Sequence, residues 1–194
     1  MSGNPTRRLP PGERRALIVD AAGRLFGERG YDATRLDDVA SAAGVTKPIL
    51  YRHFADKTTL YLALLERHRE DLGSFAAAVP AEGSLDERLR AVLVVWVAYV
   101  SDRGYAWRML FRDTGGGPEI QAVRHAVHAR ARAVLVTMIE ALREGEIPER
   151  EREPLAELMS MGMASVVLWA MDEGRTADDA IVDAMTRVWA GLLR

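Results

Sequence analysis

The side chains with the clearest chemistry in this sequence are Lys47, Tyr51, Arg52 and His53. Ammonium, phenol, guanidinium and imidazole groups donate hydrogen bonds to phosphate oxygens and to the edges of bases. On a short helix that begins near Thr46, these groups lie on one exposed face. We therefore interpret residues 46–53 as the candidate reader of a DNA major groove.

The residues around these donors predict a helix-turn-helix over residues 39–57. Gly44 stands where the chain must turn sharply, a position at which a side chain with positive φ is costly. We expect the Thr46 hydroxyl to cap the second helix. Pro48 falls in its first turn, where the missing N–H removes only an unpaired donor. Small or apolar contacts where the two helices cross come from Val39, Ala40, Ala43, Val45 and Leu50.

The order of residue types extends this motif in both directions. It runs Tyr31-x-x-Thr34-x-x-x-x-Val39-Ala40-x-x-Ala43-Gly44-Val45-Thr46-Lys47-x-x-Leu50-Tyr51-x-His53-Phe54-x-x-Lys57. With its flanks over residues 14–65, the pattern resembles the N-terminal domain of the tetracycline-repressor (TetR) family of bacterial transcription regulators. The resemblance implies a DNA-binding domain followed by a larger helical domain, and a dimer formed by the last two long helices.

The resemblance also implies roles for individual side chains. Tyr51 and His53 occupy phosphate- and base-contacting positions, and Lys57 occupies a position that clamps the DNA backbone. Arg35 would face a phosphate. Ile49 departs from the family, which more often has Thr, Ser or Ala there, so we expect apolar contact with a thymine methyl group instead. The candidate DNA-binding residues are Arg35, Thr46, Lys47, Pro48, Ile49, Tyr51, Arg52, His53 and Lys57.

Charge and composition fit a DNA-binding module joined to a domain that does not bind DNA. Residues 1–57 carry ten Lys and Arg against seven Asp and Glu, although the whole chain of 194 residues has a formal charge of −2. The chain has no cysteine, which excludes disulfides, thiolate metal sites and cysteine nucleophiles. The first residues contain no apolar signal segment, so we expect a cytoplasmic protein.

The expected fold is all-α, with about nine helices and no convincing strand. We expect an arm at residues 1–12, either disordered or reaching the minor groove. A three-helix DNA-binding domain would follow at residues 13–58, and a helical ligand-binding and dimerisation domain at residues 59–194. The apolar spacing from Glu13 predicts a first helix that stops within residues 27–30.

Local start signals place the later helices. The expected starts are Thr34 as a cap, Asp56 as a cap, a capping box at Ser84 and Glu87, Pro118 at a first helical position, a start near Pro154, and a cap at Thr176. Residues 91–100 are ten consecutive apolar residues, which periodicity alone assigns to neither strand nor helix. The capping box favours a helix that is buried on most sides. Ten apolar residues are too few to span a bilayer.

Two apolar helices near the C-terminal end predict a homodimer. Residues 154–174 leave almost no polar face, and residues 179–192 form a wide apolar stripe. This is more apolar surface than one body of this size needs, so the two helices should pair with the same helices of a second copy. The expected interface residues are Leu158, Gly162, Ser165, Trp169, Ile181, Met185, Val188, Trp189 and Leu192.

Aromatic and thioether side chains in the second domain suit an apolar ligand cavity, with ordinary core packing as the alternative for each. Arg108 would fix an anionic ligand. His125 and His128 lie on one helical face, but without a carboxylate at a fitting spacing they make a weak metal site, so we expect no metal and no cofactor. The candidate ligand-binding residues are Trp96, Tyr99, Trp107, Arg108, Phe111, His125, His128, Met138, Met159 and Met163.

These features predict a ligand-responsive transcriptional regulator. We expect a repressor that binds a palindromic operator in double-stranded DNA as a homodimer and is released by a small-molecule inducer. In the alternative, the second domain is a protein-interaction or architectural module without a small-molecule ligand. An enzyme would need a partnered nucleophile, a metal set or a carboxylate pair, and the sequence shows no such spacing. We expect no membrane partner.

Overall fold

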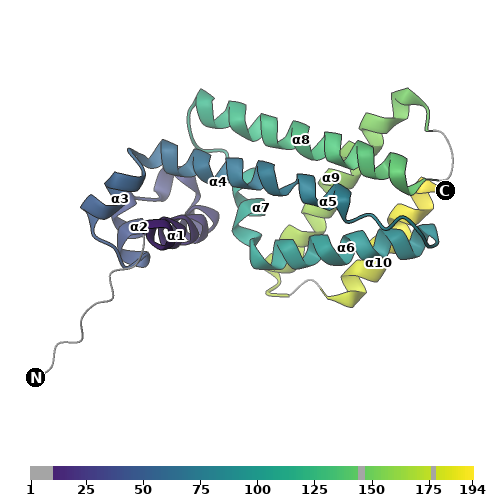
Figure 1. The fold of residues 1–194 in the computed structure, drawn as a ribbon, viewed down its shortest axis with the longest axis horizontal. Helices are drawn as coiled ribbons and strands as arrows, with labels where there is room; N and C mark the ends of the chain where they lie inside the picture. The colour runs from purple at the N-terminus through teal and green to yellow at the C-terminus, as the bar shows by residue number, and fades with distance from the viewer. Residues whose placement is uncertain (1–10, 144–146, 176–177) are drawn as a thin grey trace, which may run out of the picture.

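The computed structural model describes residues 11–143, 147–175 and 178–194, and within them every regular element is a helix (Figure 1). The helices are α1 (Pro11–Ala33), α2 (Leu36–Ala42), α3 (Lys47–His53), α4 (Lys57–Asp71), α5 (Gly73–Ala77), α6 (Leu85–Asp102), α7 (Gly104–Phe111), α8 (Pro118–Leu142), α9 (Glu149–Asp172) and α10 (Asp179–Leu193). Leu72 alone separates α4 from α5, and its own backbone is helical, so the two form one interrupted helix. The expected all-α fold is confirmed.

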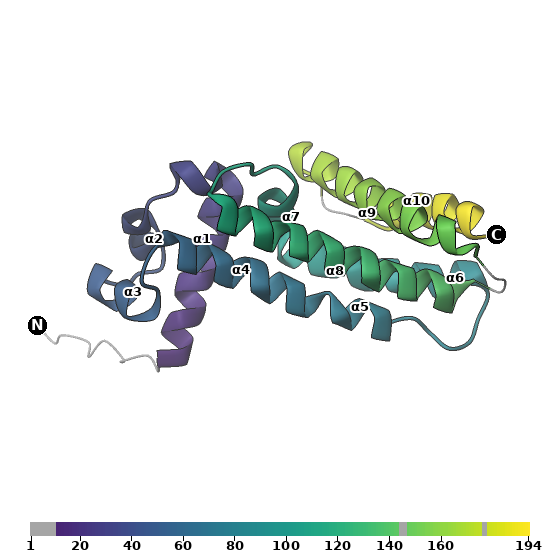
Figure 2. The ribbon, with the colours of Figure 1, turned by 90° about the horizontal axis from the view of Figure 1, so that it is seen from above.

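The helices form a small head and a longer body (Figures 1 and 2). Helices α1, α2 and α3 gather at the N-terminal end, and α4 runs from this head into the body beside α8. In the body, α8 packs against α9, and α6 packs against α10. Contacts between α1 and α7 join the head to the body directly. The head is therefore attached through both α4 and α7.

Three expected helix starts are confirmed. Asp56 Oδ1 accepts the backbone N–H of Thr59 at 2.7 Å at the start of α4. Ser84 and Glu87 form a reciprocal capping box at the start of α6, and Pro118 is the first residue of α8. Each residue satisfies or removes a backbone donor that a helix start leaves unpaired.

Neither threonine caps a helix as predicted. The Thr34 hydroxyl is buried and donates to the carbonyl oxygens of Leu25 at 3.2 Å and Gly30 at 2.8 Å, while Arg35 occupies the N-cap of α2. Thr46 does occupy the N-cap of α3, but its hydroxyl makes no capping hydrogen bond. The prediction is wrong for Thr34 because its hydroxyl closes the end of α1 instead.

Two later expectations about helices are also corrected. Helix α9 begins at Glu149, and Pro154 lies inside it, where it removes one backbone hydrogen bond without ending the helix. Helix α6 does span residues 91–100, but Val94 and Val95 are 41% and 45% exposed, so it is less buried than expected. This exposure arises because α6 packs mainly on α10 and leaves one side in solvent.

Some expectations fall outside the described residues. These are the first ten residues of the arm expected over residues 1–12, and the cap at Thr176. The last two residues of that arm, Pro11 and Gly12, instead belong to α1. Helix α1 begins at Pro11, and α10 has Asp178 at its N-cap, where the carboxylate accepts the N–H of Ile181 at 3.1 Å.

Within the described part of the chain, α9 is long and apolar enough to cross a membrane by length and composition. Core helices of globular domains pass the same test. Met159, Met163 and Val167 of α9 belong to the buried core. The packing of α9 on α8 therefore explains much of its apolar composition.

Candidate DNA interface and ligand cavity

A buried apolar contact fixes α2 against α3. Val39 and Leu50 are fully buried, and Phe54, at the C-cap of α3, is 2% exposed. Gly44 in the turn has a φ of 65°, and an added Cβ would meet no atom within 4 Å. The backbone conformation, and not crowding, therefore requires glycine here. Together these contacts hold α3 with its opposite face in solvent.

The solvent face of α3 carries the predicted DNA-binding side chains. Tyr51 is 51% exposed, and Lys47 and Arg52 are also exposed. Among the other candidates, the exposed residues are Arg35, Thr46 and Pro48, and the half-buried residues are Ile49 and His53. The structure thus brings cationic and phenolic donors together on one short exposed helix, an arrangement suited to phosphate and base contacts.

Lys47 already has a partner within the head. Its Nζ lies 2.7 Å from Asp37 Oδ2 of α2, and the two side chains are 61% and 41% exposed. Exposed ion pairs contribute little to stability because water competes for both charges. A DNA phosphate or base edge could therefore replace Asp37 at small cost. In the absence of DNA, Asp37 orients the lysine side chain.

Lys57 is half-buried and bonded to the backbone at the end of α1. Its Nζ donates to the carbonyl oxygens of Tyr31 at 2.9 Å, Asp32 at 3.3 Å and Thr34 at 3.2 Å, and it lies 4.3 Å from the centroid of the Tyr31 ring. These three bonds use all three protons of the ammonium group. Lys57 therefore has a positioning role, because its ammonium group closes the end of α1. Its contact with the DNA backbone stays a prediction.

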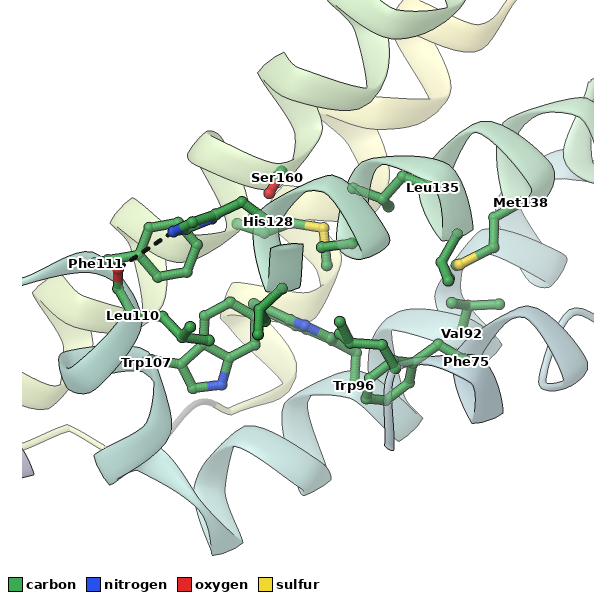
Figure 3. A pocket seen from close by; sticks show the side chains of 15 residues that line it. Phe75, Val92, Trp96, Trp107, Leu110, Phe111, His128, Leu135, Met138 and Ser160 are labelled. Carbon is green, nitrogen blue, oxygen red and sulfur yellow. Dashed lines mark hydrogen bonds between the residues drawn. The ribbon is translucent and has the colours of Figure 1, made fainter. Parts of the chain in front are cut away.

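An apolar cavity of about 60 Å³ lies in the body between α5, α6, α7, α8 and α9 (Figure 3). Six of the ten predicted ligand-binding residues line it, namely Trp96, Trp107, Phe111, His128, Met138 and Met163. The prediction missed the remaining lining residues, which are Leu72, Phe75, Val92, Leu110, Val127, Ala131, Val134, Leu135 and Ser160. Most of these residues are aliphatic, and helical periodicity does not distinguish them from ordinary core residues.

A chain of aromatic contacts forms one wall of the cavity. Trp96 meets Trp107 edge-to-face at 5.4 Å, Trp107 stacks on Phe111 at 5.5 Å, and Phe111 meets His128 at 4.8 Å. His128 Nε2 lies 3.3 Å from the Leu110 carbonyl oxygen, to which it donates as N–H (Figure 3). Burial lowers the pKa of His128, so its ring adds no charge to this wall near neutral pH.

Four predicted ligand-binding residues lie elsewhere. Tyr99 lies within 2.6 Å of His68 in a separate polar cluster, and Arg108 lies 3.8 Å from Asp172 on the other side of α7. His125 is exposed, and Met159 is buried in the core. Each shares a helix with at least one residue that lines the cavity, but its own side chain is not part of the lining. In the described residues, no three His, Asp or Glu side chains lie close enough to hold a metal ion.

Apolar side chains remain exposed on α9 and α10. Leu158, Met161 and Trp169 of α9 are 59%, 40% and 47% exposed. Val188 and Leu192 of α10 are 56% and 45% exposed. Ser165 is also exposed. These residues form a surface that a second chain could cover.

Four predicted interface residues are used within the chain instead. Ile181, Met185 and Trp189 are buried, at 6%, 4% and 8% exposure, where α10 packs in its own body. Gly162 makes room for Trp189, because an added Cβ would lie 2.7 Å from the indole Cη2. The apolar stripe of α10 is wide enough to contact both its own body and a second chain. Ile181, Met185 and Trp189 face their own body.

Comparison with known proteins agrees with this architecture. Residues 18–64 match the family model described as bacterial regulatory proteins, tetR family. The HTH-type transcriptional activator FasR of Mycolicibacterium smegmatis is 32% identical over 189 residues, which cover 95% of this chain and 85% of that protein. The putative mycofactocin biosynthesis transcriptional regulator MftR of Mycobacterium tuberculosis is 25% identical, with 91% of this chain and 90% of that protein covered.

A solved structure shows the same fold. A TetR-like transcriptional regulator from Rhodococcus sp. RHA1 is similar with a TM-score of 0.73 and 25% identity, over 95% of this chain and 98% of that one. The helix-turn-helix head, the helical body and an identity of 32% over nearly the whole chain show that this protein belongs to the tetR family of bacterial transcriptional regulators.

Proposed function

We propose that this regulator binds a palindromic operator as a homodimer and that a small apolar molecule in the body controls this binding. The observation that carries the proposal is the exposed donor face of α3, held on a buried helix-turn-helix. A helix of this kind enters the major groove, where base edges are distinguishable.

The exposed apolar residues of α9 and α10 support a dimer. Two copies paired through this surface would be related by a two-fold axis and would present two copies of α3. Helix-turn-helix dimers place their recognition helices about 34–36 Å apart, one turn of DNA, and read inverted half-sites. The proposed location is the cytoplasm, where such DNA lies.

The cavity supports an apolar ligand. Its volume of about 60 Å³ is well below the roughly 300–1,000 Å³ that surrounds a drug-sized ligand. A ligand would therefore have to open the cavity. Leu72 and Phe75 line it at the junction of α4 and α5, so opening would displace the helix that carries the head. Coupling of about 1–3 kcal/mol would change operator affinity about 5- to 150-fold.

The direction of regulation depends on the operator's place in the promoter. The relative from M. smegmatis carries the name of an activator. We propose that the ligand releases the protein from DNA. This release relieves repression where the operator overlaps the promoter.

Selection of bound genomic fragments by the purified protein tests this proposal. We expect a small set of fragments that share an inverted repeat and bind far more tightly than random DNA at the same salt concentration. Equal affinity for selected and random fragments would contradict the proposal. Genes beside the recovered fragments indicate the ligand.

The small cavity volume also favours a second candidate function, in which the body binds another protein and no small molecule. A thermal-shift screen separates the two. A compound that raises the melting temperature and also releases operator DNA supports the ligand-responsive regulator. Operator release by a protein partner, with no stabilising compound, supports the alternative.

A further inference from the structure

We propose that Asp113 and Arg124 form a buried clamp that holds the DNA-binding head at a fixed position on the body. Both are positioning residues for operator binding, and this role rests on the proposed function. Asp113 follows α7, and Arg124 lies in α8, so the pair belongs to the body. Their side chains are 8% and 5% exposed.

Asp113 reaches directly from the body to the head. Its Oδ2 accepts the backbone N–H of Tyr31 at 2.8 Å and the hydroxyl of Tyr61 at 2.8 Å, and its Oδ1 accepts the N–H of Gly115 at 2.9 Å. Gly30 has a φ of 77°, and an added Cβ would lie 3.3 Å from Asp113 Oδ1. Glycine therefore lets the chain of the head pass close to this carboxylate.

Arg124 completes the clamp from α8. Its Nη2 donates to the Tyr61 hydroxyl at 2.8 Å and lies 3.8 Å from Asp113 Oδ2, while Nη1 donates to Gln121 Oε1 at 3.0 Å. The single Tyr61 proton goes to Asp113, so its oxygen is left to accept from Arg124. Removing one member of a buried ion pair leaves the other charge uncompensated, which is costly.

Tyr31 is the residue of the head that this clamp holds. Asp113 of the body binds its N–H, and Lys57 of α4 donates to its carbonyl oxygen at 2.9 Å. Its hydroxyl lies 2.8 Å from Thr58 Oγ1, and its ring meets the Tyr61 ring edge-to-face at 5.1 Å. One residue at the end of α1 is thus fixed from α4 and from the body together.

The clamp also adjoins the cavity. Phe111 lines the cavity at the end of α7, two residues before Asp113, and His128 lines it one helical turn after Arg124 on α8. Phe111 and His128 meet edge-to-face within this wall (Figure 3). A ligand that separates these two rings would move both segments that carry the clamp.

The test compares two arginine variants. Arg124→Gln breaks the clamp, whereas Arg112→Gln breaks only the exposed pair with Asp172 next to it. Neither side chain touches the Tyr31 amide directly, so hydrogen exchange of that amide reports the clamp itself. We expect Arg124→Gln to raise this exchange rate about tenfold and to weaken operator binding about tenfold, with helical circular dichroism retained. We expect Arg112→Gln to change neither.

Tyr61→Phe provides the second variant, because it removes only the bridging hydroxyl and keeps the ring packed. We expect about a threefold loss of operator affinity, in line with one hydrogen bond. If Arg124→Gln fails to fold, the operator affinity of Tyr61→Phe tests whether the clamp contributes to DNA binding. A folded variant that binds operator like the wild type overturns the role of the clamp in operator binding, and a folded Arg124→Gln protein with unchanged Tyr31 exchange overturns the clamp itself. Wild-type protein without operator preference would instead refute the proposed function, and the exchange comparison would still test the clamp.

Discussion

Lys47 Nζ of α3 and Asp37 Oδ2 of α2 lie 2.7 Å apart, which joins the two helices of the motif across the turn at Gly44. DNA phosphates carry the same sign of charge as Asp37, so this carboxylate repels a duplex backbone while it orients the lysine. We therefore expect Asp37 to weaken binding to DNA of any sequence, while it holds Lys47 in position for contact with particular bases.

The two members of this pair should respond in opposite ways to substitution. Lys47→Ala should cost about 1–3 kcal/mol of operator affinity with a smaller loss for random DNA, because a base contact is removed. Asp37→Asn should raise affinity for random DNA about two- to fivefold, since one repulsive exposed charge disappears. Fluorescence anisotropy titrations at several salt concentrations measure both. Equal losses for operator and random DNA in Lys47→Ala would show that the lysine contacts only phosphate.

The exposed apolar surface of α9 and α10 should control oligomeric state. Trp169→Glu or Val188→Glu should give a monomer in sedimentation velocity, because a carboxylate cannot be buried unpaired between two copies. Leu17→Glu is the matched control, since Leu17 is 41% exposed but lies in α1 of the head. Unchanged dimers in both interface variants would place the interface elsewhere.

Gly162 and Gly191 should respond oppositely to alanine. Gly162→Ala should lower the free energy of unfolding by about 1–3 kcal/mol, because the new methyl group would lie 2.7 Å from the Trp189 ring. Gly191→Ala in α10 should raise it by about 0.5–1 kcal/mol, because an added Cβ meets nothing within 4 Å and alanine favours the helix. Urea unfolding measures both values. A stabilised Gly162→Ala protein would mean that Trp189 moves aside freely.

His68 should make stability depend on pH. Burial lowers its pKa to about 4, whereas an unfolded histidine titrates near 6.5. Its Nδ1 lies 2.6 Å from the Tyr99 hydroxyl, which donates to Asp71 at 3.2 Å, and Arg103 and Arg67 lie nearby. The unfolded chain therefore binds more protons below pH 6.5. The free energy of unfolding should therefore fall by up to about 3 kcal/mol as the pH is lowered from 6.5 to 4.

The control for this effect is His68→Gln, which keeps a polar group beside Tyr99 but cannot titrate in this range. Unfolding free energies measured at several pH values should show a shallower acid slope in the variant. The same slope in both proteins would assign the acid sensitivity to other groups.

Local sequence signals predicted the turn of the helix-turn-helix and several helix starts. Gly44, Asp56 and Ser84 act through neighbours within a few residues, so their spacing alone predicts the turn and the caps. Thr34 was mispredicted because its hydroxyl bonds backward, to residues of α1, and not forward into α2.

Contacts between distant segments were less predictable. Val188 and Trp189 are adjacent in one apolar stripe, yet the first is exposed and the second is buried in the body. Periodicity identifies an apolar face but not the helix that it meets. The sequence contains one local signal of the clamp. Arg124 lies on the same buried face of α8 as Ile120 and Val127, where an apolar residue would be expected.

Binding to spaced half-sites gives the most direct measurement of the central claim, that two copies of α3 read one operator together. The selected inverted repeat should be compared with a version that carries about five extra base pairs between its halves, half a helical turn. A rigid dimer should bind the original site tightly and the lengthened site no better than random DNA. Equal affinity for the original and lengthened sites would contradict paired recognition.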